Sequence, residues 1–202
     1  MFNRKCKITF IAHGTTIYSE ENRFADKPEY PPLNEAGYGE INNIVEFIKT
    51  RGLKINKIYS SPALSCTQSA EIIADELKQD FEIKQDLVNR NWGIWSGLTL
   101  SQINKKYKQE ILPLIAAHPE NGEDIKVFNN RIEQSITQII NENIRGRLII
   151  VTHPTIIQSV ISNALNIPTE SQYKIYIKPA SATQISYFEN WASLVYSDYK
   201  PL

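Results

Sequence analysis

The sequence is poor in cysteine and has no excess charge of either sign. Only Cys6 and Cys66 occur, 60 residues apart, so neither a disulfide framework nor a cysteine-based metal site is expected. Such cysteine usage fits a reducing compartment. Lys plus Arg and Asp plus Glu both number 22, and the formal net charge is zero. This balance gives no support for nucleic acid or a membrane surface as a partner.

Long apolar runs are also missing. No stretch approaches 18 apolar residues, and residues 1–7 contain no apolar segment of the kind found in leader peptides. We therefore expect a cytoplasmic protein without a membrane span. With 202 residues, of which 42% are hydrophobic, the chain is long enough for one good core. The sequence predicts a single domain over residues 1–202.

Apolar patterning predicts alternating strands and helices. Strands are expected at 7–11, 57–60, 82–86, 148–152 and 181–188. The last of these is the clearest part of a tail, residues 173–196, in which apolar and polar residues alternate as in strands. Helices are expected at 34–49, capped by Asn34, and at 98–107, 124–144 and 155–165. A further helix is expected after the strand at 57–60, with Pro62 in its first turn. The long helix would bury Val127, Ile132, Ile136, Ile139 and Ile140. Strands interleaved with helices favour an α/β domain around a mostly parallel sheet.

Two of these strands end directly in a histidine. The apolar run 8–12 is followed by His13, and the run 148–152 is followed by His153. The carboxyl ends of buried parallel strands open onto the crevice where such folds bind ligands. The two imidazoles are therefore a candidate catalytic pair, and we expect them to lie within about 10 Å of each other.

Several motifs resemble those of one enzyme family. Residues 12–16 are Ala-His-Gly-Thr-Thr where that family has Arg-His-Gly-Glu-Thr/Ser, and residues 151–154 are Val-Thr-His-Pro where it has Val-Ser/Thr-His-Gly. Other landmarks follow in the family's order, at 21–24, 32–37, 59–71, 87–97 and 119–124. On these motifs the chain resembles the histidine phosphatase superfamily, in its cofactor-dependent phosphoglycerate mutase and ribazole-phosphatase-like branch.

The resemblance implies a fold and a chemistry. The fold would be a single-domain, three-layer α/β sandwich with a mostly parallel central sheet flanked by helices. The chemistry would be phosphoryl transfer through a phosphohistidine at His13, with His153 beside it and Gly14 forming the tight turn. The family holds phosphate with two arginines and an asparagine, and protonates the leaving oxygen with a glutamate, because a dianion needs bidentate guanidinium groups and preorganised donors.

Most of that phosphate-binding set is replaced in this chain. The arginine positions are Ala12 and Ser65, the asparagine position is Ser19 and the acid position is Asn89. Loss of one such donor can cost roughly 10²–10³ in rate, so little ordinary phosphatase activity is expected. The residues expected to line the site beside the two histidines are Gly14, Thr15, Thr16, Ser19, Arg23, Ser65, Asn89, Glu123 and Pro154.

Other residues are candidates for replacing the missing groups or for acting as new catalytic groups. Arg23 or Lys27 could bring a cation to the site, although each also fits a solvated loop cation, and Glu123 could supply a carboxylate or simply favour a helix start. For Cys66 a buried structural thiol is favoured over a nucleophile, and His118 is expected on the surface. Neither a metal nor another cofactor is expected.

Three functions remain open from the sequence. The first is a repurposed enzyme in which His13 and His153 carry out acid–base chemistry on a small, weakly charged organic substrate. The second is a catalytically inactive pseudophosphatase that acts as a binding module. The third is a weak phosphomonoester phosphatase acting through phospho-His13. In each case the expected partner is a small molecule, and a homodimer is left open.

Overall fold

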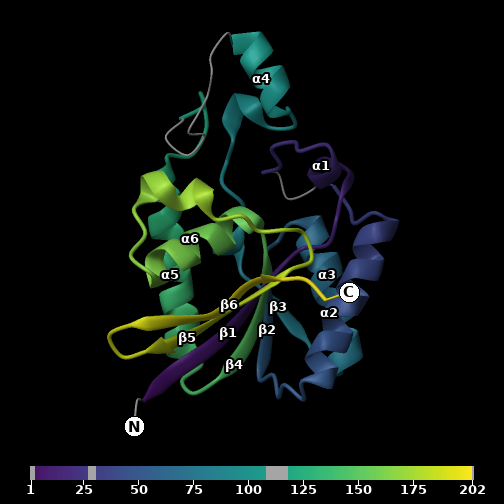
Figure 1. The fold of residues 1–202 in the computed structure, drawn as a ribbon, viewed down its shortest axis with the longest axis vertical. Coiled ribbons are helices and arrows are strands. Elements are labelled where there is room, and N and C mark those ends of the chain that lie inside the picture. The colour runs from purple at the N-terminus through teal and green to yellow at the C-terminus, as the bar shows by residue number, and fades with distance from the viewer. Residues whose placement is uncertain (1–2, 27–30, 108–117, 202) are drawn as a thin grey trace.

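One six-stranded sheet organises the chain. The structure is a computed structural model and describes residues 3–26, 31–107 and 118–201. The strands are β1 (Arg4–Ala12), β2 (Lys57–Ser60), β3 (Phe81–Ile83), β4 (Arg147–Thr152), β5 (Ala182–Phe188) and β6 (Ala192–Tyr199). Their order is β3-β2-β4-β1-β5-β6 (Figure 1). β3, β2, β4 and β1 are parallel to one another, β5 pairs antiparallel with β1, and β6 pairs antiparallel with β5, which confirms the mostly parallel sheet.

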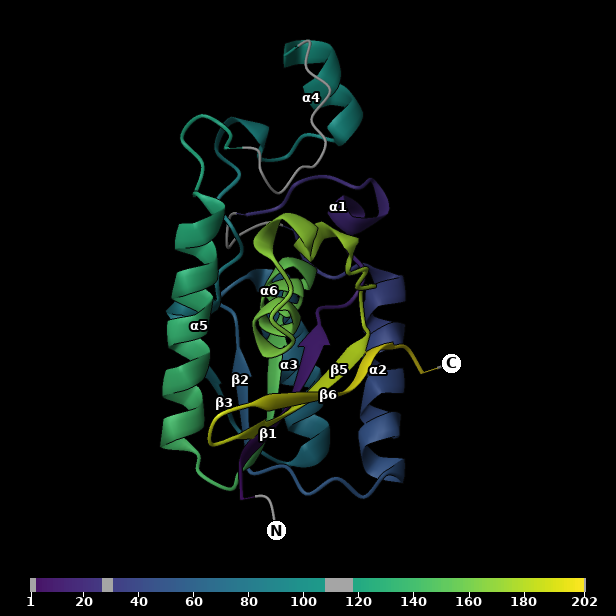
Figure 2. The same cartoon turned by 60° about the vertical axis from the view of Figure 1, so that its left-hand side comes forward.

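Helices cover both faces of the sheet and complete three layers. Helices α2 (Glu35–Thr50) and α3 (Leu64–Leu77) lie on one face, and α5 (Ile125–Glu142) and α6 (Pro154–Ala164) lie on the other (Figures 1 and 2). Each face has its own buried apolar cluster, because the strands are apolar on both sides. The predicted α/β sandwich is therefore confirmed. No helix among the described residues is long and apolar enough to cross a membrane.

A smaller cap lies beyond the carboxyl ends of the parallel strands. It contains the short helices α1 (Ile17–Glu20) and α4 (Leu100–Tyr107), which project past the end of the sheet in Figure 1. Trp92, Trp95 and Ile103 form its buried core, against which Phe24 packs. The backbone N–H of Phe24 donates to the carbonyl of Leu98, so the loop after α1 is tied to this cap.

Helix starts follow the sequence closely. Asn34 caps α2 by accepting a hydrogen bond from the backbone N–H of Gly37, as predicted. Asp124, placed at the start of the long helix, is the cap of α5 and accepts from two backbone N–H groups. Pro154 is the first residue of α6, where its missing N–H has no cost.

Four local predictions are wrong. The strand expected at 82–86 ends at Ile83 and is followed by a 3₁₀ turn, Gln85–Leu87. Pro62 precedes α3, because the extended backbone of Ala63 forms the cap. Val127 is 60% exposed, since the buried stripe of α5 runs through Phe128 and Ile132 at helical spacing. The start of the alternating tail is a 3₁₀ turn, Thr169–Lys174, rather than a strand.

Two glycines in α2 allow a matched test of the packing beneath the site. A Cβ at Gly37 would lie 2.3 Å from the carbonyl oxygen of Thr15, whereas a Cβ at Gly39 would meet nothing within 4 Å. We expect Gly37→Ala to lower the free energy of unfolding by about 1–3 kcal/mol, because backbone must move to admit the methyl group. Gly39→Ala should raise it by up to about 1 kcal/mol through helix propensity. Urea denaturation of both variants would measure these changes in the free energy of unfolding. Equal changes in the two variants would show that the close approach of Gly37 to the backbone of Thr15 does not restrict the residue at position 37.

Candidate active site

The register of two central strands places the two histidines side by side. Ala12 of β1 is paired with Thr152 of β4, so both strands reach their histidine at the same level. The backbone N–H of His13 continues the ladder by donating to the carbonyl of Thr152 at 3.0 Å. The ring centroids of His13 and His153 are 5.3 Å apart, with an interplanar angle of 74°. The expected proximity of the two imidazoles is confirmed.

The proton on the neutral His13 ring is assigned by its hydrogen bond. His13 Nδ1 lies 2.8 Å from the carbonyl oxygen of Gly14, which can only accept. Nδ1 therefore carries the proton, and Nε2 is left with a free lone pair. The turn that makes this contact is tight: the N–H of Gly14 donates to Ser69 Oγ at 3.1 Å, and a Cβ at Gly14 would lie 2.6 Å from the carbonyl oxygen of Gly37.

His153 is held by neutral groups of the β2–α3 segment. It is 5% exposed, and its Nε2 lies 3.1 Å from Ser61 Oγ and 3.6 Å from Cys66 Sγ. Burial raises the pKa of the Cys66 thiol to about 12, so the thiol is protonated at neutral pH. Cys66 is thus buried, as expected, but it also touches an imidazole nitrogen. The contact with Ser61 could not be predicted from the sequence, because it depends on the pairing of β2 with β4 across the fold.

Burial keeps both imidazoles neutral at physiological pH. Burial lowers the pKa of His13, and its hydrogen bond to Gly14 and the charge of Glu40 offset this in part. Burial lowers the pKa of His153 well below 6.5, and the neighbouring His13 lowers it further. In the described part of the chain, neither imidazole is hydrogen-bonded or ion-paired to an arginine or lysine.

Ala12 and Ser65, two residues that the motif comparison singled out, are small and buried. Ala12 is fully buried in β1, and Ser65 is 2% exposed in the first turn of α3. Thr16 and Ser19 form a reciprocal capping box at the start of α1, so the hydroxyl of Ser19 is engaged with the backbone of Thr16. Ala12 and Ser65 therefore carry no charge, and the hydroxyl of Ser19 is already hydrogen-bonded within α1.

Asn89, which the motifs place at the expected acid position, connects two segments of the chain. Its Nδ2 donates to the carbonyl of Ala25 at 2.5 Å, and its Oδ1 accepts from the hydroxyl of Thr155 in the first turn of α6. The amide thereby ties the loop after α1 to the helix that follows His153. Its predicted contact with substrate stays a prediction.

Arg23 is directed toward the cap. Its guanidinium donates to the carbonyl of Gly97 at 2.8 Å, pairs with the carboxylate of Glu21 and approaches Gln102. The structure thus gives Arg23 a role in holding the loop, and its part in binding substrate stays a prediction. Lys27, the other candidate cation, lies outside the described residues.

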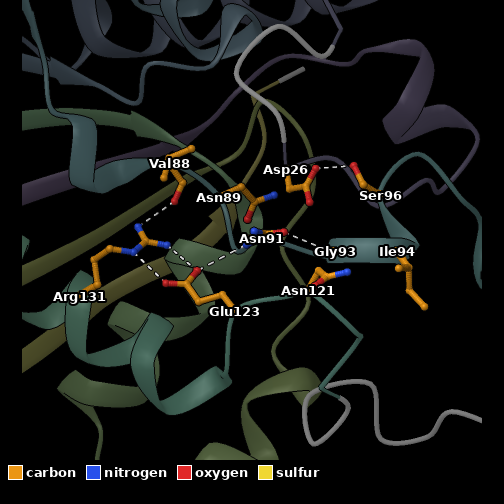
Figure 3. A pocket seen from close by; sticks show the side chains of 10 residues that line it. All are labelled: Asp26, Val88, Asn89, Asn91, Gly93, Ile94, Ser96, Asn121, Glu123 and Arg131. Carbon is orange, nitrogen blue, oxygen red and sulfur yellow. Dashed lines mark hydrogen bonds and ion pairs between the residues drawn. The ribbon is translucent and has the colours of Figure 1, made fainter.

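A cavity of about 760 Å³ has Asn89 in its wall. It is lined by Asp26, Val88, Asn89, Asn91, Gly93, Ile94, Ser96, Asn121, Glu123 and Arg131 (Figure 3). The carboxylate of Glu123 is paired with Arg131 through two contacts of 3.0 and 2.7 Å, and its part in binding substrate stays a prediction. The charged groups in the wall are two carboxylates and one guanidinium, a balance that disfavours a phosphate dianion.

The remaining candidates behave as surface or structural groups. The side chain of His118 is 57% exposed and lies 3.7 Å from the carboxylate of Asp124. Cys6 and Cys66 are both free and buried. No group of three or more His, Cys, Asp or Glu side chains in the described ranges is arranged to hold a metal ion.

The lowered histidine pKa values predict a pH dependence of stability. At a pH between the lowered histidine pKa values of the folded protein and 6.5, the unfolded chain binds more protons than the folded chain. The contribution of the two histidines to the free energy of unfolding is therefore fully present above about pH 6.5 and is lost as the pH falls. Each suppressed proton contributes a slope of up to about 1.4 kcal/mol per pH unit. Denaturant unfolding of wild type and His153→Gln from pH 7.5 to 5 should show a shallower decline for the variant. His118→Gln is the matched control, and a slope unchanged in His153→Gln would contradict the assignment.

Comparisons with known proteins agree with the architecture. Residues 8–198 match the sequence model of the histidine phosphatase superfamily (branch 1). A bifunctional protein of Mycobacterium tuberculosis is 24% identical over 196 residues, covering 94% of this chain and 52% of that protein. A 2,3-bisphosphoglycerate-dependent phosphoglycerate mutase of Parvibaculum lavamentivorans is 25% identical over 163 residues, covering 76% and 77%. The chain spans about half the length of the first of these relatives.

Solved structures share the fold at low sequence identity. Mycobacterial hydrolase 1 superposes with a TM-score of 0.86 at 19% identity, covering 96% of this chain and 98% of that one. A putative α-ribazole-5′-P phosphatase of Escherichia coli K-12 gives 0.81 at 17% identity, covering 98% and 99%. With the family match over residues 8–198, the strand order and the two strand-end histidines, this chain belongs to the histidine phosphatase superfamily.

Proposed function

We propose that this member of the superfamily performs acid–base chemistry on a small, weakly charged organic substrate, with His13 and His153 as the proton-carrying pair. The observation that carries the proposal is two neutral imidazoles, 5.3 Å apart, with no cationic partner among the described residues. A neutral imidazole can both accept and return a proton near neutral pH.

The protonation of His13 gives the pair its direction. His13 Nε2 has the free lone pair, so it is the base that accepts a proton from the substrate or from a water molecule. The imidazolium that results is close to His153, which is hydrogen-bonded to the neutral hydroxyl of Ser61. His153 is then the second group through which a proton reaches or leaves the reacting atoms.

Phosphate chemistry is poorly supported by the same surroundings. A phosphate dianion is normally held by bidentate guanidinium groups, and the positions for them are the buried Ala12 and Ser65. Asn89 replaces the acid and already bridges Ala25 and Thr155. Family membership nevertheless keeps weak phosphatase activity through phospho-His13 as an alternative, and the engaged side chains of Asn89 and Arg23 support the inactive binding module.

A pair of chromogenic substrates separates these functions. We expect the protein to hydrolyse 4-nitrophenyl acetate, a neutral ester, and to leave 4-nitrophenyl phosphate unchanged, with no isolable phosphohistidine. His13→Ala should lower ester turnover by about 10²-fold or more, the usual contribution of a positioned general base. His118→Gln should match wild type. Phosphate turnover abolished by His13→Ala would establish the phosphatase instead, and turnover of neither substrate above the His13→Ala background would favour the binding module.

The missing phosphate groups can be restored together. We expect Ala12→Arg with Ser65→Arg and Asn89→Glu to create vanadate binding that the wild-type chain does not show, because the register of β1 and β4 brings the two histidines to the same level. Saturating vanadate at 100 times its Kd should add about 2.7 kcal/mol to the free energy of unfolding, seen as a raised Tm. Wild-type chain stabilised by vanadate, or a triple variant that folds and binds none, would contradict this expectation.

A further inference from the structure

One peptide group connects His13 to a carboxylate on α2. The carbonyl of Gly14 accepts the proton of His13 Nδ1 at 2.8 Å. The N–H of the same peptide unit belongs to Thr15, and it donates to Glu40 Oε2 at 3.0 Å. In a trans peptide the C=O and N–H point in opposite directions, so the imidazole and the carboxylate lie at opposite ends of one polarisable group.

Glu40 is well suited to hold that peptide. The hydroxyl of Thr15 also donates to Glu40 Oε2 at 2.7 Å, and Lys200 Nζ, after β6, lies 2.6 Å from Oε1. Burial raises the pKa of Glu40, but the hydrogen bonds from Lys200 and Thr15 outweigh it, and the pKa lies below its ordinary value. The carboxylate is therefore ionised at the pH where His13 is neutral.

We propose that Glu40 is a positioning residue for His13, and that its carboxylate, acting through the Gly14–Thr15 peptide, fixes the imidazole with its proton on Nδ1 and raises the basicity of Nε2. This inference rests on the proposed acid–base function. A negative charge at the N–H end of the peptide strengthens its carbonyl as an acceptor, which stabilises the protonated ring. Lys200 moderates the effect, because it neutralises part of the charge on Glu40.

The groups that face His13 come from several elements. Glu40 comes from α2 with Lys200 behind it, and His153, at the junction of β4 and α6, carries the contact with Cys66. Of these groups only the Glu40–Lys200 pair is ionised at neutral pH, since the imidazoles are neutral and the thiol is protonated. Substitution of Glu40 or of Lys200 therefore changes the charge of this ion pair and leaves the residues that contact the imidazole rings unchanged.

Removing each charge in turn gives opposite expected shifts. Glu40→Gln keeps an oxygen that can accept from Thr15 but removes the charge, so the pKa of His13 should fall and turnover of the neutral ester should drop about 10-fold, as for other partners that orient a histidine. Lys200→Gln keeps a donor for Glu40 but removes its counter-charge, so the pKa of His13 should rise. In the pH profile of ester turnover, the acid limb should move to lower pH in the first variant and to higher pH in the second.

The readout is ¹⁵N NMR of the His13 ring in the full chain, which reports both its tautomer and its pKa without any substrate. Glu76→Gln removes a carboxylate that pairs with Lys49 on the outer surface and is the matched control, with no shift expected. Opposite shifts of the His13 pKa in Glu40→Gln and Lys200→Gln support the inference. They do so even if the ester is not turned over, because absence of turnover counts only against the proposed function. Shifts of the same sign, or no shift in a folded Lys200→Gln protein, would overturn it. If Glu40→Gln does not fold, Lys200→Gln decides the question alone.

Discussion

The parallel register between β1 and β4 is the constraint on which the rest of the site depends. Pairing of Ala12 with Thr152 brings two strand ends to the same level, and each chain continues directly into a histidine. A shift of one residue would reverse the faces of β1 and separate the imidazoles. Apolar packing on both sides of the sheet holds this register, so the core fixes the distance between the two catalytic candidates.

The same burial decides the charge of the site. Imidazoles at the ends of buried strands lose hydration, and this is the largest effect on both their pKa values. In a phosphatase, guanidinium groups and a bound dianion would supply opposing charges around the nucleophile. Here Ala12 and Ser65 supply none, and the neutral Ser61 and Cys66 contact His153. The protein groups hydrogen-bonded to the two imidazoles are therefore all uncharged in the part of the chain that the structure describes.

Local patterning predicted the elements that depend on local interactions. The Asn34 and Asp124 caps, the strand Lys57–Ser60 and the helix opening at Pro154 follow from side chains that act within a few residues. Contacts made across the fold could not be predicted in this way. The contacts of Glu123 with Arg131 and of Asn89 with Thr155 depend on loop paths that no periodicity encodes, and the parts of Glu123 and Asn89 in binding substrate stay predictions.

The turn after His13 shows how a replaced motif can retain a carboxylate. The family motif has glutamate after the glycine, and this chain has Thr15, which donates to Glu40 with both its N–H and its hydroxyl. The negative charge therefore reaches the turn from α2. Close approach of Gly14 to Gly37 allows this, because two backbones without side chains bring the helix within hydrogen-bonding distance of the turn. The carboxylate of Glu40 is thus held one peptide group away from the His13 ring, where its charge favours the protonated form of that ring.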